Sequence, residues 1–403
     1  MMHSEKPFVL HGLPEKVIFC KRCVMSNQRP STSPELVKKD TRIDTVGFDD
    51  DGVCHACKYL EIKKRIDWKE REEKLVQLLD KHRRKDGHWD VVVPGSGGKD
   101  SAYVSHVLKY RYGMHPLTVT WPPHVYTDIG WKNFQQWLRR GGFDNISLTP
   151  NPKVHAILTR LAFLNLLNPF QPFIIGQKNL APRVALSEKV PLIMYGENQA
   201  EYHNKLVETQ SPLMSRTHYT SKPGQTFRFG GVELDALKDH GVDKKELIPY
   251  LPIPEAEAEK AGIEIHYMSY YHEWKPQENY YYSVEHTGFE PNPERSEGTY
   301  SKYASLDDRV DGFHYYTMFI KFGQGRAMND AAHEIRDGHI TREEAVALVR
   351  KYDGEFPKKY YREFLDYIGI DEGQFHAAVD RNRSPHLWDL KPGGEWVLKH
   401  QVS

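Results

Sequence analysis

Residues 95–101, GSGGKDS, combine the residue types that bind phosphate. They follow WDVVV (89–93), a short apolar run typical of a buried strand, and precede a helical pattern that begins at residue 102. Glycines let the backbone approach an anion, and the amides and dipole at a helix N-terminus favour negative charge. A lysine adds positive charge, and an aspartate can hold Mg²⁺ on phosphates. The stretch therefore predicts a phosphate-binding loop formed by Ser96, Gly97, Gly98, Lys99, Asp100 and Ser101.

Two better-known phosphate motifs fail on specific residues. A P-loop needs serine or threonine after Gly98-Lys99, where Asp100 stands, and a glycine five residues before Gly98, which is absent. The dinucleotide fingerprint would begin at Gly95 and Gly97 and would also need a glycine at position 100. The remaining alternative is a glycine-rich turn with a serine or aspartate helix cap.

The four cysteines of the chain form two CxxC pairs, Cys20 with Cys23 and Cys54 with Cys57. Each pair places two thiolates on one tight turn, so two pairs can complete a tetrahedron around Zn²⁺. Four thiolates leave no open position for catalysis, so we expect a structural zinc site that stabilises a small domain. An iron–sulfur cluster is the alternative.

Strand and helix patterns alternate after the loop, which predicts a parallel sheet flanked by helices. The apolar runs are short and continuous, as expected for strands buried on both faces. We expect strands at 89–93, 115–121, 145–150, 172–176, 190–198 and 266–274, and helices at 67–85, 102–112, 129–142, 153–167 and 179–189.

Three parts of the chain are expected: an N-terminal zinc-binding module at 1–66, a nucleotide-binding α/β domain at 67–285 and a helical region at 286–403. Residues 200–265 are polar with turn signals, which indicates an insertion in the α/β domain. The 55 basic residues balance 55 acidic ones, which argues against a nucleic-acid partner. Because the sequence has neither a membrane-length apolar run nor a signal-peptide pattern, we expect a cytoplasmic protein.

The string S-G-G-x-D-S after an apolar strand resembles the loop of the PP-loop ATP pyrophosphatase family. The resemblance implies an adenine-nucleotide α-hydrolase-like fold and cleavage of ATP to AMP and pyrophosphate. Members adenylate a carbonyl or amide oxygen and then let ammonia or sulfur displace AMP. ATP and Mg²⁺ are the implied cofactors, in addition to Zn²⁺.

Four further stretches are similar to the N-acetyl sugar amidotransferases of this family, at 118–135, 169–185, 194–202 and 321–345. That resemblance implies conversion of an acetamido to an acetamidino group on a sugar of lipopolysaccharide O-antigen or a nonulosonic acid. The substrate is expected to be a nucleotide-linked uronic acid. Ammonia is expected from a partner glutaminase and its cyclase-like companion, similar to the subunits of imidazole glycerol phosphate synthase. Because every cysteine lies in a CxxC pair, no thiol is left for a glutaminase site in this chain.

Roles beyond the loop are assigned from position near predicted strand ends. Lys99, Asp100 and Glu197 are the candidate catalytic residues, with Glu197 holding Mg²⁺ or orienting the acetamido group. Lys321, Gln324 and Arg326 form a glycine-flanked basic segment that is a candidate contact for AMP or a sugar phosphate. Candidates for sugar binding are Asp128, Gln177, Lys178 and Arg183.

Two other functions are compatible with the motifs. A tRNA-thiolating PP-loop enzyme also pairs CxxC motifs with this loop, but it needs a basic surface and often a catalytic cysteine near the sheet. The neutral charge and the lack of cysteine after residue 57 count against it. The third hypothesis is a zinc-containing scaffold that binds nucleotide within a glutaminase complex without turnover.

Overall fold

A parallel five-stranded sheet forms the centre of the computed structural model, which describes residues 9–30, 45–198, 201 and 211–403. The strand order is β3-β2-β1-β4-β9, with Val92 of β1 paired to Leu117 of β2 and Ile193 of β4. The strands are β1 (Val91–Pro94), β2 (Pro116–Thr120), β3 (Asp144–Ser147), β4 (Leu192–Tyr195) and β9 (Glu264–Tyr267). The predicted α/β fold with a parallel sheet and flanking helices is confirmed.

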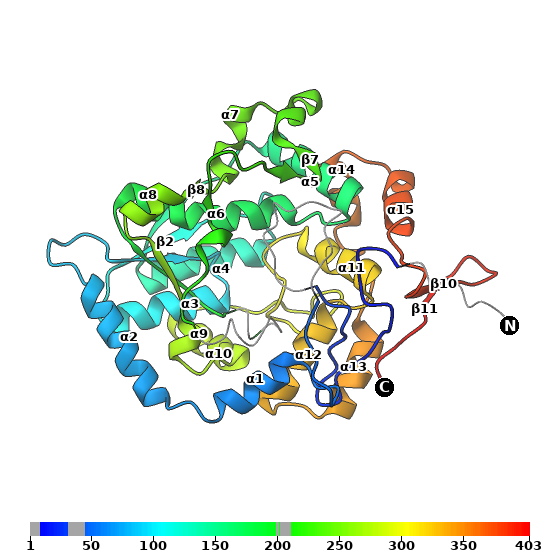
Figure 1. Ribbon diagram of the computed structural model, residues 1–403, viewed down its shortest axis with the longest axis horizontal. Coiled ribbons are helices and arrows are strands. Elements are labelled where there is room, and N and C mark those ends of the chain that lie inside the picture. Colours follow the sequence, from blue (N-terminus) through cyan, green and yellow to red (C-terminus); the bar gives the residue numbers. More distant parts are fainter. Residues whose placement is uncertain (1–8, 31–44, 199–200, 202–210) are drawn as a thin grey trace.

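Helices cover both faces of the sheet (Figure 1). Successive side chains of β1 point to opposite faces, so Val92 packs in the core beneath α5 and α6, while Val91 and Val93 pack with α2 and α3. Burial on both faces explains why β1 reads as an uninterrupted apolar run. The helices of this layer are α2 (Trp68–His82), α3 (Lys99–His106) with its π-helical continuation η1 (Val107–Arg111), α4 (Asp128–Gly141), α5 (Pro152–Leu166), α6 (Gln171–Glu188), α8 (Glu255–Lys260) and α10 (Pro276–Thr287).

The predicted strand at 172–176 is wrong, because these residues form the first turns of α6. A short apolar run fits a buried helix as well as a strand. In α6 the buried positions include Phe173, Gly176 and Leu180, spaced by three and four residues, and Trp121 packs so closely on Gly176 that a Cβ there would lie 2.1 Å from its ring. Only the first part of the predicted strand at 266–274 is extended, since β9 ends at Tyr267 and α9 (Met268–Tyr271) follows.

Short elements fill residues 211–254 of the predicted insertion, and they pack on α5 and α6. They are η4 (Arg216–His218), β5 (Thr220–Ser221), β6 (Arg228–Phe229), β7 (Val232–Glu233), η5 (Leu234–His240), α7 (Lys244–Leu247), η6 (Ile248–Tyr250) and β8 (Ile253–Pro254). The predicted insertion also includes residues 200 and 202–210, which lie outside the described residues. The division of the chain into three parts stays a prediction.

The C-terminal region is helical, as predicted, and ends in a small hairpin. It packs against the sheet layer, because Phe163 of α5 stacks on Phe375 at a centroid distance of 5.1 Å. Its elements are α11 (Asp311–Phe322), α12 (Arg326–Asp337), α13 (Arg342–Tyr352), α14 (Tyr361–Ile368), α15 (Glu372–Asp380), β10 (Trp388–Leu390) and β11 (Trp396–Leu398).

The N-terminal segment with the cysteines lies against α12 and α13, far from it in sequence (Figure 1). Met328, Ala331 and Ala332 of α12 share one buried cluster with the cysteines. Helix α1 (His55–Lys63) then leads back towards α2 and the sheet. Across the described parts of the chain, no helix is long and apolar enough to cross a bilayer.

Candidate active site

The predicted phosphate loop leaves the carboxyl end of β1 and opens α3. β1 is the central strand, and its neighbours β2 and β4 continue the sheet in opposite directions, which is where open α/β sheets bind ligands. Gly98 is the N-cap of α3, with no side chain capping the helix. Gly97 has φ +86°, and a Cβ there would lie 2.7 Å from the Cα of Phe134, so only glycine fits.

Helix α10 holds the loop from the side. Asn279 Nδ2 donates to Asp100 Oδ1 at 3.3 Å, and Ser283 Oγ donates to the carbonyl of Lys99 at 2.8 Å. Lys99 and Asp100 also form an ion pair with each other. These contacts could not be predicted from the sequence, because polar residues within a helix such as QENYYYSVEH carry no motif.

Asp307 reaches the loop from the C-terminal part of the chain. Its carboxylate hydrogen-bonds to Ser96, and burial raises its pKa. Its carbonyl accepts from the amide of Thr127, 3.1 Å away, at the start of α4. Ser101 turns inward and donates its hydroxyl to the carbonyl of Gly98 at 3.1 Å. A segment distant in sequence therefore closes one side of the phosphate loop.

A cavity of about 150 Å³ lies between the loop and this segment, and we call it the loop cavity. The phosphate loop forms one wall, and residues 303–307 with Arg326 form the facing wall; Gly130, Asn133 and Phe289 complete the lining. A second cavity of about 420 Å³, the large cavity, is lined by Arg29 and Pro30 of the N-terminal segment, the start of α10, residues 301–304, and α11 and α12. Of the described residues, four line both cavities: Lys99, Tyr303, Ala304 and Arg326.

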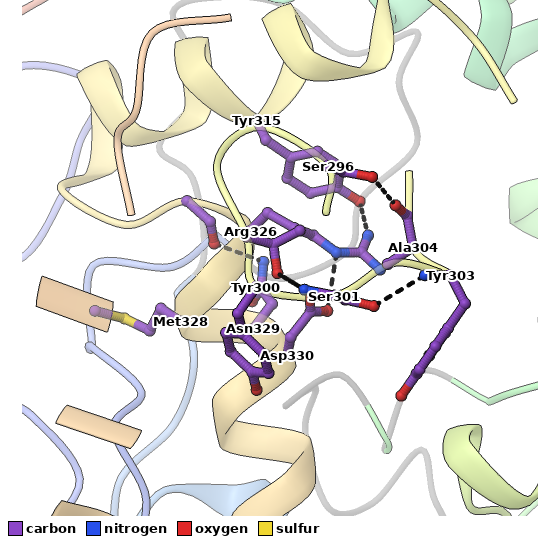
Figure 2. Close-up of polar contacts among 12 residues, drawn as sticks. Ser296, Tyr300, Ser301, Tyr303, Ala304, Tyr315, Arg326, Met328, Asn329 and Asp330 are labelled. Carbon is purple, nitrogen blue, oxygen red and sulfur yellow. Dashed lines mark hydrogen bonds and ion pairs between the residues drawn. The ribbon is translucent and has the colours of Figure 1, made fainter. Parts of the chain in front are cut away.

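Arg326 lines both cavities. Polar contacts with its neighbours fix its side chain (Figure 2). Its Nε donates to Asp330 Oδ1 at 2.9 Å, and its Nη1 donates to the hydroxyl of Tyr315 at 2.5 Å. Asp330 is held in turn by the hydroxyl of Thr299, which donates to Oδ2 at 2.6 Å. The guanidinium therefore has a defined orientation in the cavity wall.

Some buried polar atoms in the wall of the large cavity have no hydrogen-bond partner. Among the described residues, His314 Nδ1 and Asn329 Oδ1 in its wall have no hydrogen-bond partner, nor has either amide atom of the fully buried Gln324. Burial lowers the pKa of His314 to about 3, so its ring is neutral at pH 7. Most buried polar groups in proteins are paired, so unpaired ones around a cavity are typical of a ligand site.

Glu197 follows β4 at the same sheet edge as the loop. The neighbouring Gly196 faces Asp100, since a Cβ on Gly196 would lie 3.7 Å from the Cβ of Asp100. Glu197 is half-buried and is not among the residues that line either cavity. The structure thus brings its segment beside Asp100, and its catalytic role stays a prediction.

The four predicted sugar-binding residues line neither of these cavities. Two are exposed, and Arg183 donates from Nη2 to the carbonyls of Ile248 and Leu251, both at 2.8 Å, which connects α6 to the segment after α7. Burial lowers the pKa of Arg183. A role in sugar binding therefore stays a prediction for these residues, which are Asp128, Gln177, Lys178 and Arg183.

The four cysteines meet in one buried cluster, with all Sγ atoms within 4.8 Å of one another. Cys20 and Cys57 are 3.9 Å apart, and Cys23 and Cys54 are 3.6 Å apart. A Zn²⁺ ion with Zn–S bonds of about 2.3 Å needs tetrahedron edges of about 3.8 Å, whereas a disulfide would need about 2.05 Å. The cluster could therefore hold zinc as predicted.

Contacts from the C-terminal helices connect this cluster to the large cavity. Arg342 of α13 donates from Nε to the carbonyl of Cys23 at 3.2 Å. The same helix α12 that packs on the cysteines through Ala331 and Ala332 presents Arg326 and Asn329 to the large cavity. The cysteine cluster and the cavity wall therefore share one helix.

Comparison with known proteins finds a similarity for the C-terminal part of the chain. Residues 297–402 match the family model of the C-terminal domain of the LPS biosynthesis protein WbpG-like family. No curated protein matches the chain. Chains of solved structures match in 47 cases, among them the NMN synthetase from Francisella tularensis, at 14% identity with 57% of this chain and all of that chain covered. Its TM-score is 0.20, which carries no argument, so the similarity that bears on function is the one to the LPS biosynthesis domain.

Proposed function

We propose that this protein is an ATP-dependent amidotransferase of bacterial surface polysaccharide biosynthesis. It adenylates the acetamido oxygen of an N-acetylated sugar and lets ammonia displace AMP, which leaves an acetamidino sugar. The observation that carries the proposal is the contact between two cavities at Lys99 and Arg326. One cavity belongs to the phosphate loop, and the other is walled mainly by the region similar to the LPS biosynthesis domain.

In the first step the acetamido oxygen forms a bond to the α-phosphorus of ATP. The bond between the α-phosphorus and the bridging oxygen breaks, and pyrophosphate leaves with the electron pair. Amides at the start of α3 and the ammonium of Lys99 stabilise the leaving pyrophosphate. Activation is needed because an amide oxygen is a poor leaving group, whereas AMP is a good one.

Asp100 and Glu197 are the carboxylates that would hold Mg²⁺ beside the phosphates, since both lie at the carboxyl edge of the sheet. When bound, this ion neutralises charge on the phosphates. In the structure the Asp100 carboxylate already faces the loop, where Lys99 and Asn279 contact it. Hard oxygen ligands of this kind fit Mg²⁺ better than the thiolate cluster does.

In the second step ammonia attacks the activated carbon, and AMP leaves with the former amide oxygen. The ammonia comes from a separate glutaminase with its cyclase-like companion. All four cysteines meet in the buried cluster, so none is available as the nucleophile of a glutaminase site or of a thiolation reaction. The acceptor is a nucleotide-linked uronic acid, and the cations Arg29 and Lys321 in the large cavity suit its negative charges.

The test is incubation of the purified protein with ATP, Mg²⁺, ammonium chloride and a panel of nucleotide-linked diacetamido sugars. We expect AMP and pyrophosphate to form only with an accepted sugar, and mass spectrometry should show NH in place of O in that sugar. Release of ADP would contradict the proposal, and so would AMP formation that does not depend on any of the sugars. Tight ATP binding without AMP under any condition would favour a scaffold, and tRNA-dependent AMP formation would favour thiolation.

A further inference from the structure

We infer that Arg326 contacts the α-phosphate of ATP and neutralises the charge that develops there when the acceptor oxygen attacks. The inference rests on the proposed function, because it takes ATP as the ligand of the phosphate loop. It assigns a catalytic contact to a residue that lies more than 200 positions after the loop.

The position of Arg326 supports this assignment. It lines the loop cavity together with Ser96 and Lys99, and it also lines the large cavity. Of the four residues common to both, only Lys99 and Arg326 carry a positive charge. Burial raises the pKa of Tyr303, so its phenol is neutral at pH 7. Two cations, one from each wall, therefore face the place where the cavities meet.

The chemistry of adenylation requires charge neutralisation at that place. Phosphates bound by the loop occupy the loop cavity, and an acceptor in the large cavity can reach phosphorus only where the two cavities join. When the acceptor oxygen bonds to the α-phosphorus and pyrophosphate leaves, negative charge accumulates on the non-bridging α-oxygens. A guanidinium presents paired N–H donors to such oxygens, which an ammonium cannot do.

Neighbouring residues hold Arg326 in place before any ligand binds. Asp330 and Tyr315 fix the guanidinium, as the dashed contacts in Figure 2 show. The half-buried Asp353 accepts from the amide of Gly325 at 2.7 Å and from that of Met328 at 3.2 Å, which fixes the start of α12. A charge held in advance costs little reorganisation when the transition state forms.

The experiment compares binding of α,β-methylene-ATP with Mg²⁺ to the wild type, Arg326→Ala and Arg362→Gln by isothermal titration calorimetry. Arg362 is an exposed residue of α14, so its substitution removes the same charge far from both cavities. We expect Kd to rise about tenfold or more in Arg326→Ala, as for loss of a charge-assisted hydrogen bond, and to stay within about twofold in the control. Tyr315→Phe should give an intermediate loss, because it removes only a group that orients the guanidinium.

Arg326→Lys separates charge from geometry, since it should keep part of the affinity but recover little of kcat for AMP formation. If Arg326→Ala fails to fold, Arg326→Gln carries the same comparison, because it keeps a donor towards Asp330. A folded Arg326→Ala or Arg326→Gln protein that binds the analogue as tightly as the wild type overturns the inference.

The outcomes also separate this inference from the proposed function. Suppose that the wild type binds the analogue, that Arg326→Ala weakens this binding, and that no sugar supports AMP formation. The contact of Arg326 with the α-phosphate is then supported, and the proposed acceptor class is wrong. If the wild type does not bind the analogue at all, both proposals fall.

Discussion

The two walls of the candidate site are built in opposite ways. The phosphate loop collects its groups from six consecutive residues, Ser96 to Ser101, between one strand and one helix. The facing wall takes Arg29 from the N-terminal segment, residues 301–304 from a loop, and Arg326 from α12. The loop is thus a local structure supported by the sheet, whereas the facing wall exists only when distant segments pack together.

This difference predicts that substitutions in the two walls affect activity and stability differently. Substitutions of the loop's charged side chains should alter chemistry and leave the free energy of unfolding nearly unchanged. Changes beneath the facing wall should lower stability first and activity as a consequence. Each of the following experiments tests that distinction.

Metal removal should have the largest effect, because the cysteine cluster supports α12 through Met328, Ala331 and Ala332. Structural zinc contributes roughly 10–16 kcal/mol to the folding of small zinc modules. We therefore expect chelation, or Cys57→Ser, to unfold the N-terminal segment, lower the Tm of the whole protein and abolish turnover. Calorimetry and elemental analysis by mass spectrometry measure these effects.

The control is re-addition of Zn²⁺. It should restore the Tm and turnover of the chelated wild type but not those of Cys57→Ser. A metal-free protein with an unchanged Tm and normal turnover would show that the cluster is not structural. Iron in place of zinc, with a visible absorption band, would identify an iron–sulfur cluster instead.

Asp100→Asn should give the reverse pattern. Under the proposed function, loss of the carboxylate would remove a ligand for Mg²⁺ beside the phosphates, and we expect kcat for AMP formation to fall roughly 10²- to 10³-fold. The side chain is partly exposed and already engaged with Lys99, so the free energy of unfolding should change by less than about 1 kcal/mol. Steady-state kinetics measures the loss of kcat, and urea unfolding measures the free energy of unfolding. A large loss of stability would show that the phosphate loop and the facing wall do not differ in this respect.

Lys63 tests the connection between the N-terminal segment and the sheet. Its ammonium lies 3.0 Å from Glu201 Oε1 and 3.1 Å from the carbonyl of Trp274, with both charged side chains 7% exposed. Lys63→Met leaves a buried carboxylate without its cation, which should cost about 3–5 kcal/mol in urea unfolding. The double variant Lys63→Met with Glu201→Leu removes both charges and should recover most of that loss. Equal losses in the single and double variants would mean that the ion pair is not what holds these segments.

Substitution of Asp353 should have the smallest effect, and its effect on stability should depend on pH. Burial raises the pKa of this carboxyl to about 7, above its ordinary value. The folded protein therefore binds the proton more tightly than the unfolded chain, so this contribution to stability is present below about pH 4 and is lost as pH rises through about 7. Asp353→Asn removes the titration, so stability relative to wild type should increase by about 1 kcal/mol or more between pH 4.5 and 8. A difference between the two proteins that does not change with pH would contradict the assignment.

The sequence was informative where the chemistry is local. The loop between β1 and α3, the two CxxC pairs and the alternation of strands and helices each depend on neighbouring residues, and the structure contains the strand–loop–helix geometry, the cysteine cluster and the alternation. Phosphate binding by the loop stays a prediction. Helix α6 was mistaken in part for a strand, because Phe173 to Gly176 form a continuous apolar run whose helical period shows only over a longer window.

Residues assembled over long distances were not predictable. No spacing rule relates Asp307 to Ser96, or Asn279 to Asp100, because tertiary packing alone brings them together. Arg326 was a candidate from its basic, glycine-flanked segment, but its place between two cavities depends on α12 resting on the cysteine cluster. Gln177 was chosen for its position after a strand that is in fact a helix.

The contacts of Glu201 have a consequence for synthesis of the chain. Its carboxylate meets Lys63, 138 positions earlier, and its carbonyl accepts from Arg336, 135 positions later. Contacts between such distant segments form late and slowly in folding. A nascent chain that has completed the phosphate loop therefore still lacks α12 and Arg326, so under the proposed function a half-made protein would not yet have the complete site for ATP.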